Sequence, residues 1–125
     1  MTGITRLDHV NLRTAHLDAM VQWYEDILGF HVGPRPNFSF GGAWLYRGED
    51  ALVHLVEVDT QPAEQHGLKM EHVAFSSSGL SAFREMLESK GVHYELLHIA
   101  DFDITQMNIW DPDGNHLHID FIGER

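Results

Sequence analysis

The feature of this sequence that most restricts its fold is an internal duplication. Three segments recur in the same order at offsets of 62 to 64 residues: Leu7–Val10 at Met70–Val73, Leu28–His31 at Lys90–His93, and Gly48–His54 at Asp111–His118. Offsets that agree so closely indicate that a unit of about 60 residues is written twice. We therefore expect one domain spanning 1–125, with a first module at about 5–60, a linker at 61–69 and a second module at about 70–122.

Each copy has the pattern of a strand, a helix and three further strands. Apolar residues recur at helical spacing in Leu17–Leu28 and Leu80–Lys90, and Gly29 and Gly91 follow as helix C-terminal glycines. The expected strands are Leu7–Leu12, Phe30–Pro34, Ala43–Arg47 and Ala51–Val58 in the first copy, and Glu71–Ser76, Tyr94–Ile99, Gln106–Trp110 and His116–Phe121 in the second. Asp111–Gly114 reads as a tight turn. The pattern predicts an α+β fold of two βαβββ modules that form a curved mixed sheet.

Alternation along these strands separates an apolar face from a polar one. In the last strand His116, His118 and Asp120 share one side, and Leu117, Ile119 and Phe121 share the other. The other strands repeat this division, so the apolar face can pack under the helices. The opposite face collects histidine and amide side chains, and a sheet curved toward that face would form a polar cleft.

Composition restricts the partners that such a cleft can have. The chain has 19 acidic and 8 basic residues, a net charge of −11, so nucleic acid and anionic membranes are not expected partners. It has no cysteine, so any metal must be held by imidazole, carboxylate or backbone oxygen. No apolar run is long enough to cross a bilayer, and the N-terminus lacks a signal-peptide core. We expect a cytoplasmic protein.

Four of the ten histidines form two repeat-equivalent pairs. His9 corresponds to His72, and His54 corresponds to His118. An approximate twofold duplication brings equivalent positions together around its axis, so the two pairs could converge on one ion. Imidazole nitrogen favours transition metals over Mg²⁺ and Ca²⁺. The sequence therefore predicts one divalent transition metal, with Zn, Ni, Fe, Co and Mn as candidates.

Several motifs resemble those of the vicinal oxygen chelate superfamily, and in particular a small glyoxalase-like subgroup. They are Leu7–Val10, Trp23-Tyr24 with Leu28–Phe30, Arg35–His54, His72–Phe75 and Asp111–Asn115. This superfamily includes glyoxalase I, the bleomycin and fosfomycin resistance proteins, methylmalonyl-CoA epimerase and the extradiol dioxygenases. The resemblance covers almost the whole chain. It implies paired βαβββ modules around a metal, and often a homodimer.

The resemblance also assigns His9, His54, His72 and His118 to the ligand positions of the family. Position 118 departs from the family pattern, which usually has glutamate there, and in glyoxalase I position 54 is typically glutamate too. Four neutral histidines leave a divalent ion with a charge of +2, a stronger Lewis acid than an ion with two carboxylate ligands. The change also removes the carboxylate that glyoxalase-type isomerases use as a base.

Other residues of the polar face are candidates for catalysis and substrate binding. Asp120 lies on the same side as His118 and could act as the base or orient that ring. Trp44, Gln106 and Asn108 are expected to contact substrate. Phe40 could belong to an apolar lid in a loop rich in glycine and proline, and Arg35 could bind a substrate carboxylate.

Three functions remain open. The first is a metal-dependent lyase or isomerase of glyoxalase type, acting on a small oxygenated substrate that chelates the metal through adjacent oxygens. The second is an extradiol-type ring-cleaving dioxygenase. The third is a non-catalytic small-molecule binding protein like the bleomycin resistance proteins.

Overall fold

The computed structural model describes residues 3–63 and 67–125 and separates into two compact units, Met1–Glu64 and Gln65–Arg125. We call these units the first half and the second half, and each is described by itself. The predicted linker 61–69 includes residues 64–66, which lie outside the described residues.

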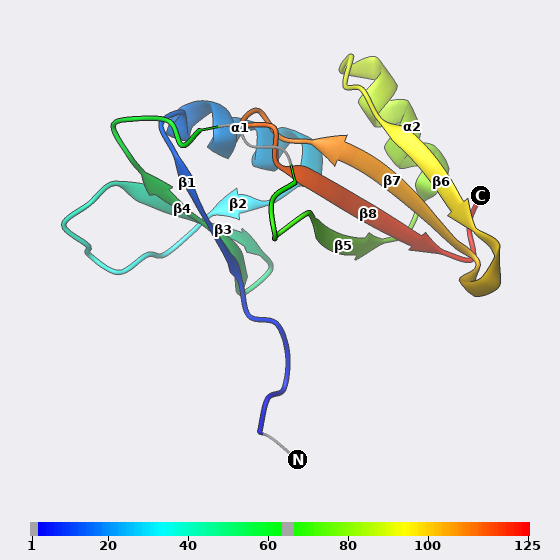
Figure 1. Cartoon of the computed structure of the whole chain (residues 1–125), viewed down its shortest axis with the longest axis horizontal. Coiled ribbons are helices and arrows are strands. Elements are labelled where there is room, and N and C mark those ends of the chain that lie inside the picture. Colours follow the sequence, from blue (N-terminus) through cyan, green and yellow to red (C-terminus); the bar gives the residue numbers. More distant parts are fainter. Residues whose placement is uncertain (1–2, 64–66) are drawn as a thin grey trace. The chain divides into compact units, whose positions relative to one another are not determined.

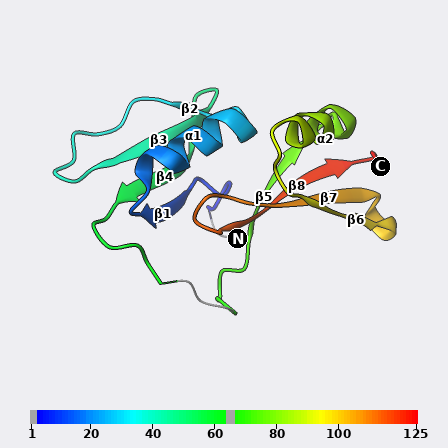
Figure 2. The same ribbon diagram turned by 90° about the horizontal axis from the view of Figure 1, so that it is seen from above.

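The first half contains one helix and a four-stranded mixed sheet (Figure 1). Its elements are β1 (Val10–Thr14), α1 (Leu17–Leu28), β2 (His31–Val32), β3 (Gly42–Arg47) and β4 (Asp50–Glu57). The strand order is β1-β4-β3-β2, with β1 parallel to β4 and the other pairs antiparallel. Figure 2 shows α1 lying along this sheet, against which it buries Met20, Tyr24 and Ile27. Gly29 ends the helix at a φ of 72°.

The second half repeats this topology. It contains β5 (Val73–Ser77), α2 (Leu80–Ser89), β6 (Glu95–Ile99), a short 3₁₀ turn η1 (Ala100–Phe102), β7 (Ile104–Trp110) and β8 (His116–Ile122). The strand order is β5-β8-β7-β6, again with only the first pair parallel. The predicted α+β class and the two βαβββ units are therefore confirmed.

The predicted division into an apolar and a polar face is also confirmed in the second half. Thr105, Met107 and Ile109 alternate with partly exposed residues along β7, and Leu117, Ile119 and Phe121 are buried on β8. Phe83 of α2 packs edge-on against Phe121, with 5.8 Å between ring centroids. Helix α2 therefore packs on the apolar face of the sheet and does not cover the histidine face.

The predicted turn between β7 and β8 is confirmed and is held by its first residue. The backbone amide of Gly114, at a φ of 85°, donates to the carbonyl oxygen of Asp111. Oδ1 of Asp111 accepts the amides of Asp113 and Asn115 at 3.0 and 2.9 Å. Because one side chain satisfies two backbone donors, the start of β8 is fixed in register.

The predicted starts of two strands were wrong. β1 begins at Val10 and β5 at Val73, so His9 and His72 lie immediately before their strands. The parallel ladders begin at Val10 opposite Val53 and at Val73 opposite Leu117. The repeated motifs at Leu7–Val10 and Met70–Val73 suggested earlier starts, but strand assignment also requires a hydrogen-bonded neighbour, and the ladders begin only at Val10 and Val73.

We expect the buried face of α2 to carry much of the stability of the second half. Leu87 is fully buried, and truncating a buried leucine costs about 2–5 kcal/mol because lost apolar contacts and a residual cavity add together. Leu87→Ala should lower the free energy of unfolding in urea by that amount. Leu97→Ala is the matched control, since Leu97 on β6 is 56% exposed and should change stability by about 0.5 kcal/mol or less. Equal effects of the two substitutions would contradict this assignment of the core.

Candidate metal centre

In the first half, His9 and His54 form a stacked pair. Their ring centroids lie 3.7 Å apart and the rings are within 9° of parallel. His54 sits on β4 opposite Asn11, two residues after His9, so the two side chains leave the parallel strands on the same face. Nε2 of His54 lies 3.1 Å from the carbonyl oxygen of Ala51 and donates to it. Nδ1 of His54 is then the nitrogen with an available lone pair.

The second half repeats this pair at the equivalent positions. His72 and His118 have ring centroids 4.0 Å apart and an interplanar angle of 14°. His118 lies opposite Ala74, two residues after His72, which is the register found for His54 and Asn11. The duplication inferred from sequence therefore extends to the geometry of two imidazole pairs, each formed within its own half.

The spacing and the electrostatics of both pairs suit a transition metal. Two imidazole nitrogens bound to one tetrahedral zinc ion, with bonds of about 2.0–2.1 Å, lie roughly 3.3 Å from each other. The ring centroids of the two pairs lie 3.7 and 4.0 Å apart, so both imidazoles of a pair could bind one ion after the stacked rings turn to point their lone pairs at it. Burial, reinforced by the neighbouring His9 or His72, lowers the pKa of His54 and of His118. Both rings are therefore neutral at neutral pH, the state that binds metal.

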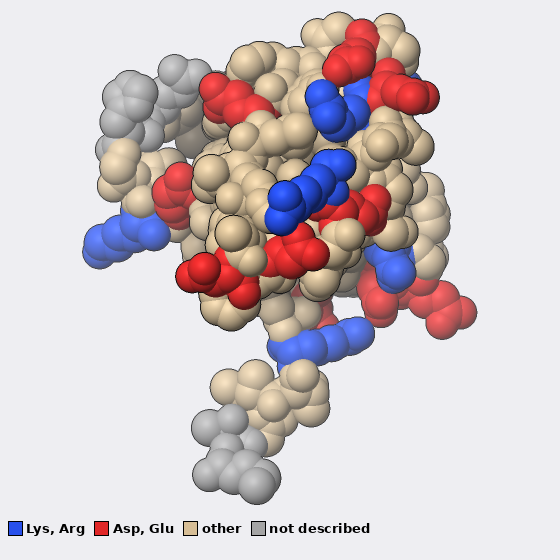
Figure 3. Space-filling model, turned by 90° about the vertical axis from the view of Figure 1, so that its right-hand side faces the viewer, with Lys and Arg blue, Asp and Glu red and all other residues tan. Residues whose placement is uncertain are grey.

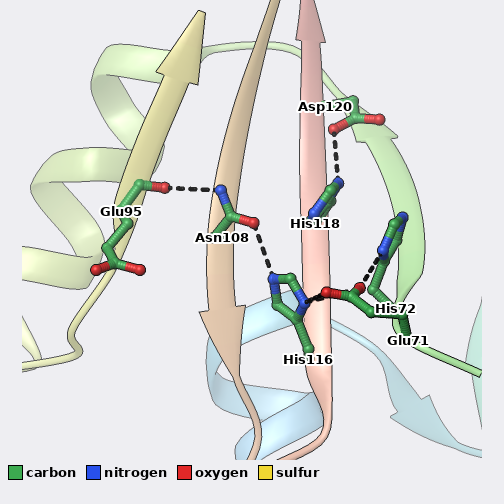
Figure 4. A network of polar contacts seen from close by, with 7 residues as sticks. All are labelled: Glu71, His72, Glu95, Asn108, His116, His118 and Asp120. Atoms are coloured by element: carbon green, nitrogen blue, oxygen red, sulfur yellow. Dashed lines mark hydrogen bonds and ion pairs between the residues drawn. The ribbon is translucent and has the colours of Figure 1, made fainter. Parts of the chain in front are cut away.

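A carboxylate orients the first histidine of each pair. Nδ1 of His9 lies 2.7 Å from Oδ1 of Asp8, and Nδ1 of His72 is hydrogen-bonded to Glu71 (Figure 4). These bonds lower the pKa of the Asp8 and Glu71 carboxyl groups, so the carboxylates accept and the ring nitrogens donate. Nε2 of each ring is left to bind a metal, the arrangement in which outer carboxylates raise ligand basicity. We did not predict this role, although an acidic residue precedes the histidine in both repeats.

His116 joins the pair of the second half. One ring nitrogen from each of His72, His116 and His118 lies within 4.8 Å of the others. Strand alternation puts His116 on the same face as His118, but the predicted four-histidine ligand set does not include it. Nδ1 of His116 lies 3.1 Å from both carboxylate oxygens of Glu71, and Nε2 lies 2.8 Å from Oδ1 of Asn108. Figure 4 shows the ring of His116 between the carboxylate of Glu71 and the side chain of Asn108.

Asp120 lies next along β8 from this cluster. Its Oδ1 is 3.9 Å from Nδ1 of His118, and Figure 4 draws this ion pair. The same oxygen is buried and has no hydrogen-bond partner within residues 3–63 and 67–125. A buried carboxylate oxygen without a donor is costly unless a positive charge lies near it. Asp120 therefore adds negative charge where a cation would bind.

The predicted substrate residues fall into two groups. Trp44 pairs with His54 across β3 and β4 and stacks on it, with centroids 3.9 Å apart. The ring centroid of Phe38 lies 6.4 Å from that of Trp44 and 4.9 Å from that of Phe40. A row of aromatic rings therefore continues from the histidine pair into the β2–β3 loop. Arg35 lies over both phenylalanine rings and donates from Nη2 to the carbonyl oxygen of Phe40. Arg35 thus holds this loop together.

The other group lies on β7. Asn108 pairs with His118 across the ladder, and Gln106 pairs with Asp120. Both polar atoms of the Asn108 side-chain amide are engaged, since Nδ2 donates to the carbonyl oxygen of Glu95 at 3.3 Å and Oδ1 accepts from His116. In this structure Asn108 therefore orients His116. Gln106 lies beside Asp120, the candidate catalytic carboxylate on the histidine face of β8.

The surface carries mixed charge around these elements. On the face seen in Figure 3, basic side chains are interspersed with acidic ones and do not gather into a continuous positive patch. Within the described parts of the chain, no helix is long and apolar enough to span a bilayer.

Comparison with known proteins identifies relatives of this chain. The family model described as Glyoxalase/Bleomycin resistance protein/Dioxygenase superfamily matches residues 6–119. A protein named Glyoxylase I 4 from Arabidopsis thaliana is 28% identical over 123 residues, which cover 93% of this chain and 70% of the relative.

Solved structures show the same fold. A glyoxalase family protein from Bacillus anthracis superposes with a TM-score of 0.78 at 22% identity, covering 98% of each chain. A glyoxylase/bleomycin resistance protein/dioxygenase domain from Frankia sp. EAN1pec gives 0.77 at 21% identity, covering 96% of this chain and 93% of that one.

The orienting role of the two carboxylates can be tested by amide substitution. Asp8→Asn and Glu71→Gln should each weaken nickel affinity about 10- to 100-fold, because an amide cannot fix the Nδ1–H tautomer as a carboxylate does. Affinity would be measured by titration calorimetry, with far-UV circular dichroism to establish that the fold is retained. Glu85→Gln on the exposed side of α2 is the matched control. Unchanged affinity in both site variants would exclude an orienting role.

Proposed function

Because the chain belongs to the Glyoxalase/Bleomycin resistance protein/Dioxygenase superfamily, we propose that it is a metal-dependent lyase or isomerase of glyoxalase type. Its substrate would be a small oxygenated molecule that chelates the metal through adjacent oxygen atoms. The ligands would be His9, His54, His72 and His118.

The observation that carries this proposal is the identical construction of two histidine pairs. In each half a histidine just before the first strand stacks on a buried histidine of the last strand, with the same register and nearly the same spacing. A pocket-lining role would not require equal register, parallel rings and an orienting carboxylate in both halves. A ligand role for both pairs would account for the shared register and for the orienting carboxylates.

The four imidazoles fit a divalent transition metal, and as neutral ligands they determine the net charge of the metal–ligand group. Imidazoles as the only ligands would leave the ion with its full +2 charge, where the family's glutamate at position 118 would reduce that charge. When bound, the ion supplies Lewis-acid polarisation of substrate oxygens. Histidine at position 118 therefore favours substrates that present anionic oxygen.

Asp120 is the residue we assign to proton transfer. It lies one side-chain position along β8 from His118, and its buried Oδ1 lacks a hydrogen-bond donor within the described residues. A carboxylate in that setting can take a proton from a substrate carbon and return it to a neighbouring one. Gln106, opposite Asp120 in the ladder, is placed to hold the substrate or the carboxylate.

The aromatic residues of the first half favour an apolar group on the substrate. Trp44 stacks on His54, and Phe40 belongs to the adjoining loop, where it is 46% exposed. A substrate whose oxygens are held at the histidines could lay its apolar part on these rings. Arg35 remains a candidate to bind a substrate carboxylate, through the guanidinium N–H groups that do not donate to Phe40.

Metal content is the first test. Protein purified without a histidine tag and dialysed against Zn²⁺, Ni²⁺, Co²⁺ or Fe²⁺ should retain about one ion per chain, because four imidazoles exceed the three protein ligands of many catalytic zinc sites. His72→Ala should lower retention at least tenfold by elemental analysis. His31→Ala, an exposed histidine of β2, serves as the control. Protein that stays metal-free with all four ions would refute the proposal.

The same loaded protein separates the alternative activities. Oxygen consumption with catechols after anaerobic iron loading would indicate a ring-cleaving dioxygenase. Ligand binding without metal would indicate a sequestration protein like the bleomycin resistance proteins. Either result would replace the lyase or isomerase assignment.

Asp120 can be tested by exchange of carbon-bound hydrogen. In D₂O, the metal-loaded protein should exchange the hydrogen on the hydroxyl-bearing carbon of an α-hydroxycarbonyl substrate for deuterium. NMR would follow this exchange. Asp120→Asn should slow that exchange about 10²- to 10⁴-fold, the usual contribution of a positioned base. Metal content should be unchanged, and Asp101→Asn in the exposed turn η1 should behave as the parent. Full exchange by Asp120→Asn would remove this residue from the mechanism.

A further inference from the structure

The second half contains a metal-ligand set of its own. His116 brings a third imidazole to within 4.8 Å of the ligand atoms of His72 and His118. We propose that these three histidines form a metal site that the second half provides by itself, with His116 as a ligand that neither the duplication nor the four-histidine assignment includes. This inference rests on the proposed function only in treating His72 and His118 as ligands.

The three rings approach from different directions. His72 and His118 are nearly parallel, whereas His116 stands edge-on to both, at interplanar angles of 66° and 71°. The centroid distances from His116 are 5.6 Å to His72 and 5.0 Å to His118. Three histidines would hold a divalent ion and leave a position for a water or substrate oxygen, as in three-histidine catalytic zinc sites.

His116 is held in place by its surroundings. Its ring stacks on Trp110 at 5.2 Å and 12°, and its two nitrogens contact Glu71 and Asn108. A metal held by one ring nitrogen would take the place of that nitrogen's hydrogen bond, and the other nitrogen would still donate to its present acceptor, Glu71 or Asn108. That second bond would orient His116 in the way that carboxylates and amide oxygens orient other metal-bound histidines.

The charge around the cluster matches a divalent cation. Glu71 contacts both His72 and His116, and Asp120 lies 3.9 Å from His118 with its buried oxygen unpartnered within the described residues. Two carboxylates beside three imidazoles would offset part of the +2 charge of the ion. Figure 4 shows that all five residues come from β8 and from the segment that leads into β5.

The first half has no equivalent of this third ligand. The residue 64 positions before His116 is Leu52, and the position equivalent to Asn108 is Trp44. The duplicated unit has therefore diverged. The second half alone would then offer three histidine ligands to an ion.

The test uses the full chain and removes one half's imidazoles at a time. His9→Ala/His54→Ala should still bind one Co²⁺ or Ni²⁺ per chain by equilibrium dialysis, whereas His72→Ala/His118→Ala should bind none. Adding His116→Ala to the first double variant should weaken its affinity at least 100-fold. His116→Gln, which keeps a polar group against Glu71 and Asn108, should do the same. His98→Gln on β6 is the control, and thermal unfolding would verify that each variant folds.

Each outcome has a separate meaning. If the parent protein binds metal and His9→Ala/His54→Ala does not, the four-histidine site stands and the self-sufficient site of the second half is refuted. If His116→Gln leaves the affinity of the double variant unchanged, His116 is not a ligand. If the double variant binds as tightly as the parent, the inference stands and the four-histidine assignment fails.

Discussion

Parallel pairing between the first and last strands of each half determines where the candidate ligands lie. In both halves the buried histidine of the last strand faces a residue two positions after the histidine that precedes the first strand. A parallel ladder cannot slip by one residue without turning its apolar side chains to the polar face. The register that buries Leu55 and Val53, or Leu117 and Ile119, is therefore the register that stacks the imidazoles.

Much of the fold could be predicted from sequence because its signals are local and repeated. The α1 boundaries, the glycine that ends α1, the Asp111–Gly114 turn and the alternation along β7 depend on neighbouring residues and follow from periodicity and turn chemistry. The starts of β1 and β5 could not be predicted in this way. They depend on where a strand 43 or 44 residues away begins to pair, and no local signal marks that position.

The candidate site was predicted in part for a similar reason. Equivalence between the repeats selects His9, His54, His72 and His118, since a duplicated site needs duplicated ligands. It cannot select His116, whose equivalent is Leu52, nor can it show that Asn108 is engaged by His116 and Glu95. Those contacts depend on side-chain rotamers across three strands. The orienting carboxylates Asp8 and Glu71 were recoverable in principle, because they recur in both copies of the motif.

The stacked tryptophans have a consequence for how occupancy could be observed. Trp44 lies against His54 in the first half and Trp110 lies against His116 in the second, each with its indole face on the imidazole. An open-shell ion bound to either imidazole would be close enough to quench the fluorescence of the indole stacked on it. The third tryptophan, Trp23, lies on α1 and packs edge-on against Tyr24. Each half thus carries its own optical reporter, and single tryptophan replacements would show which half's histidines the ion contacts.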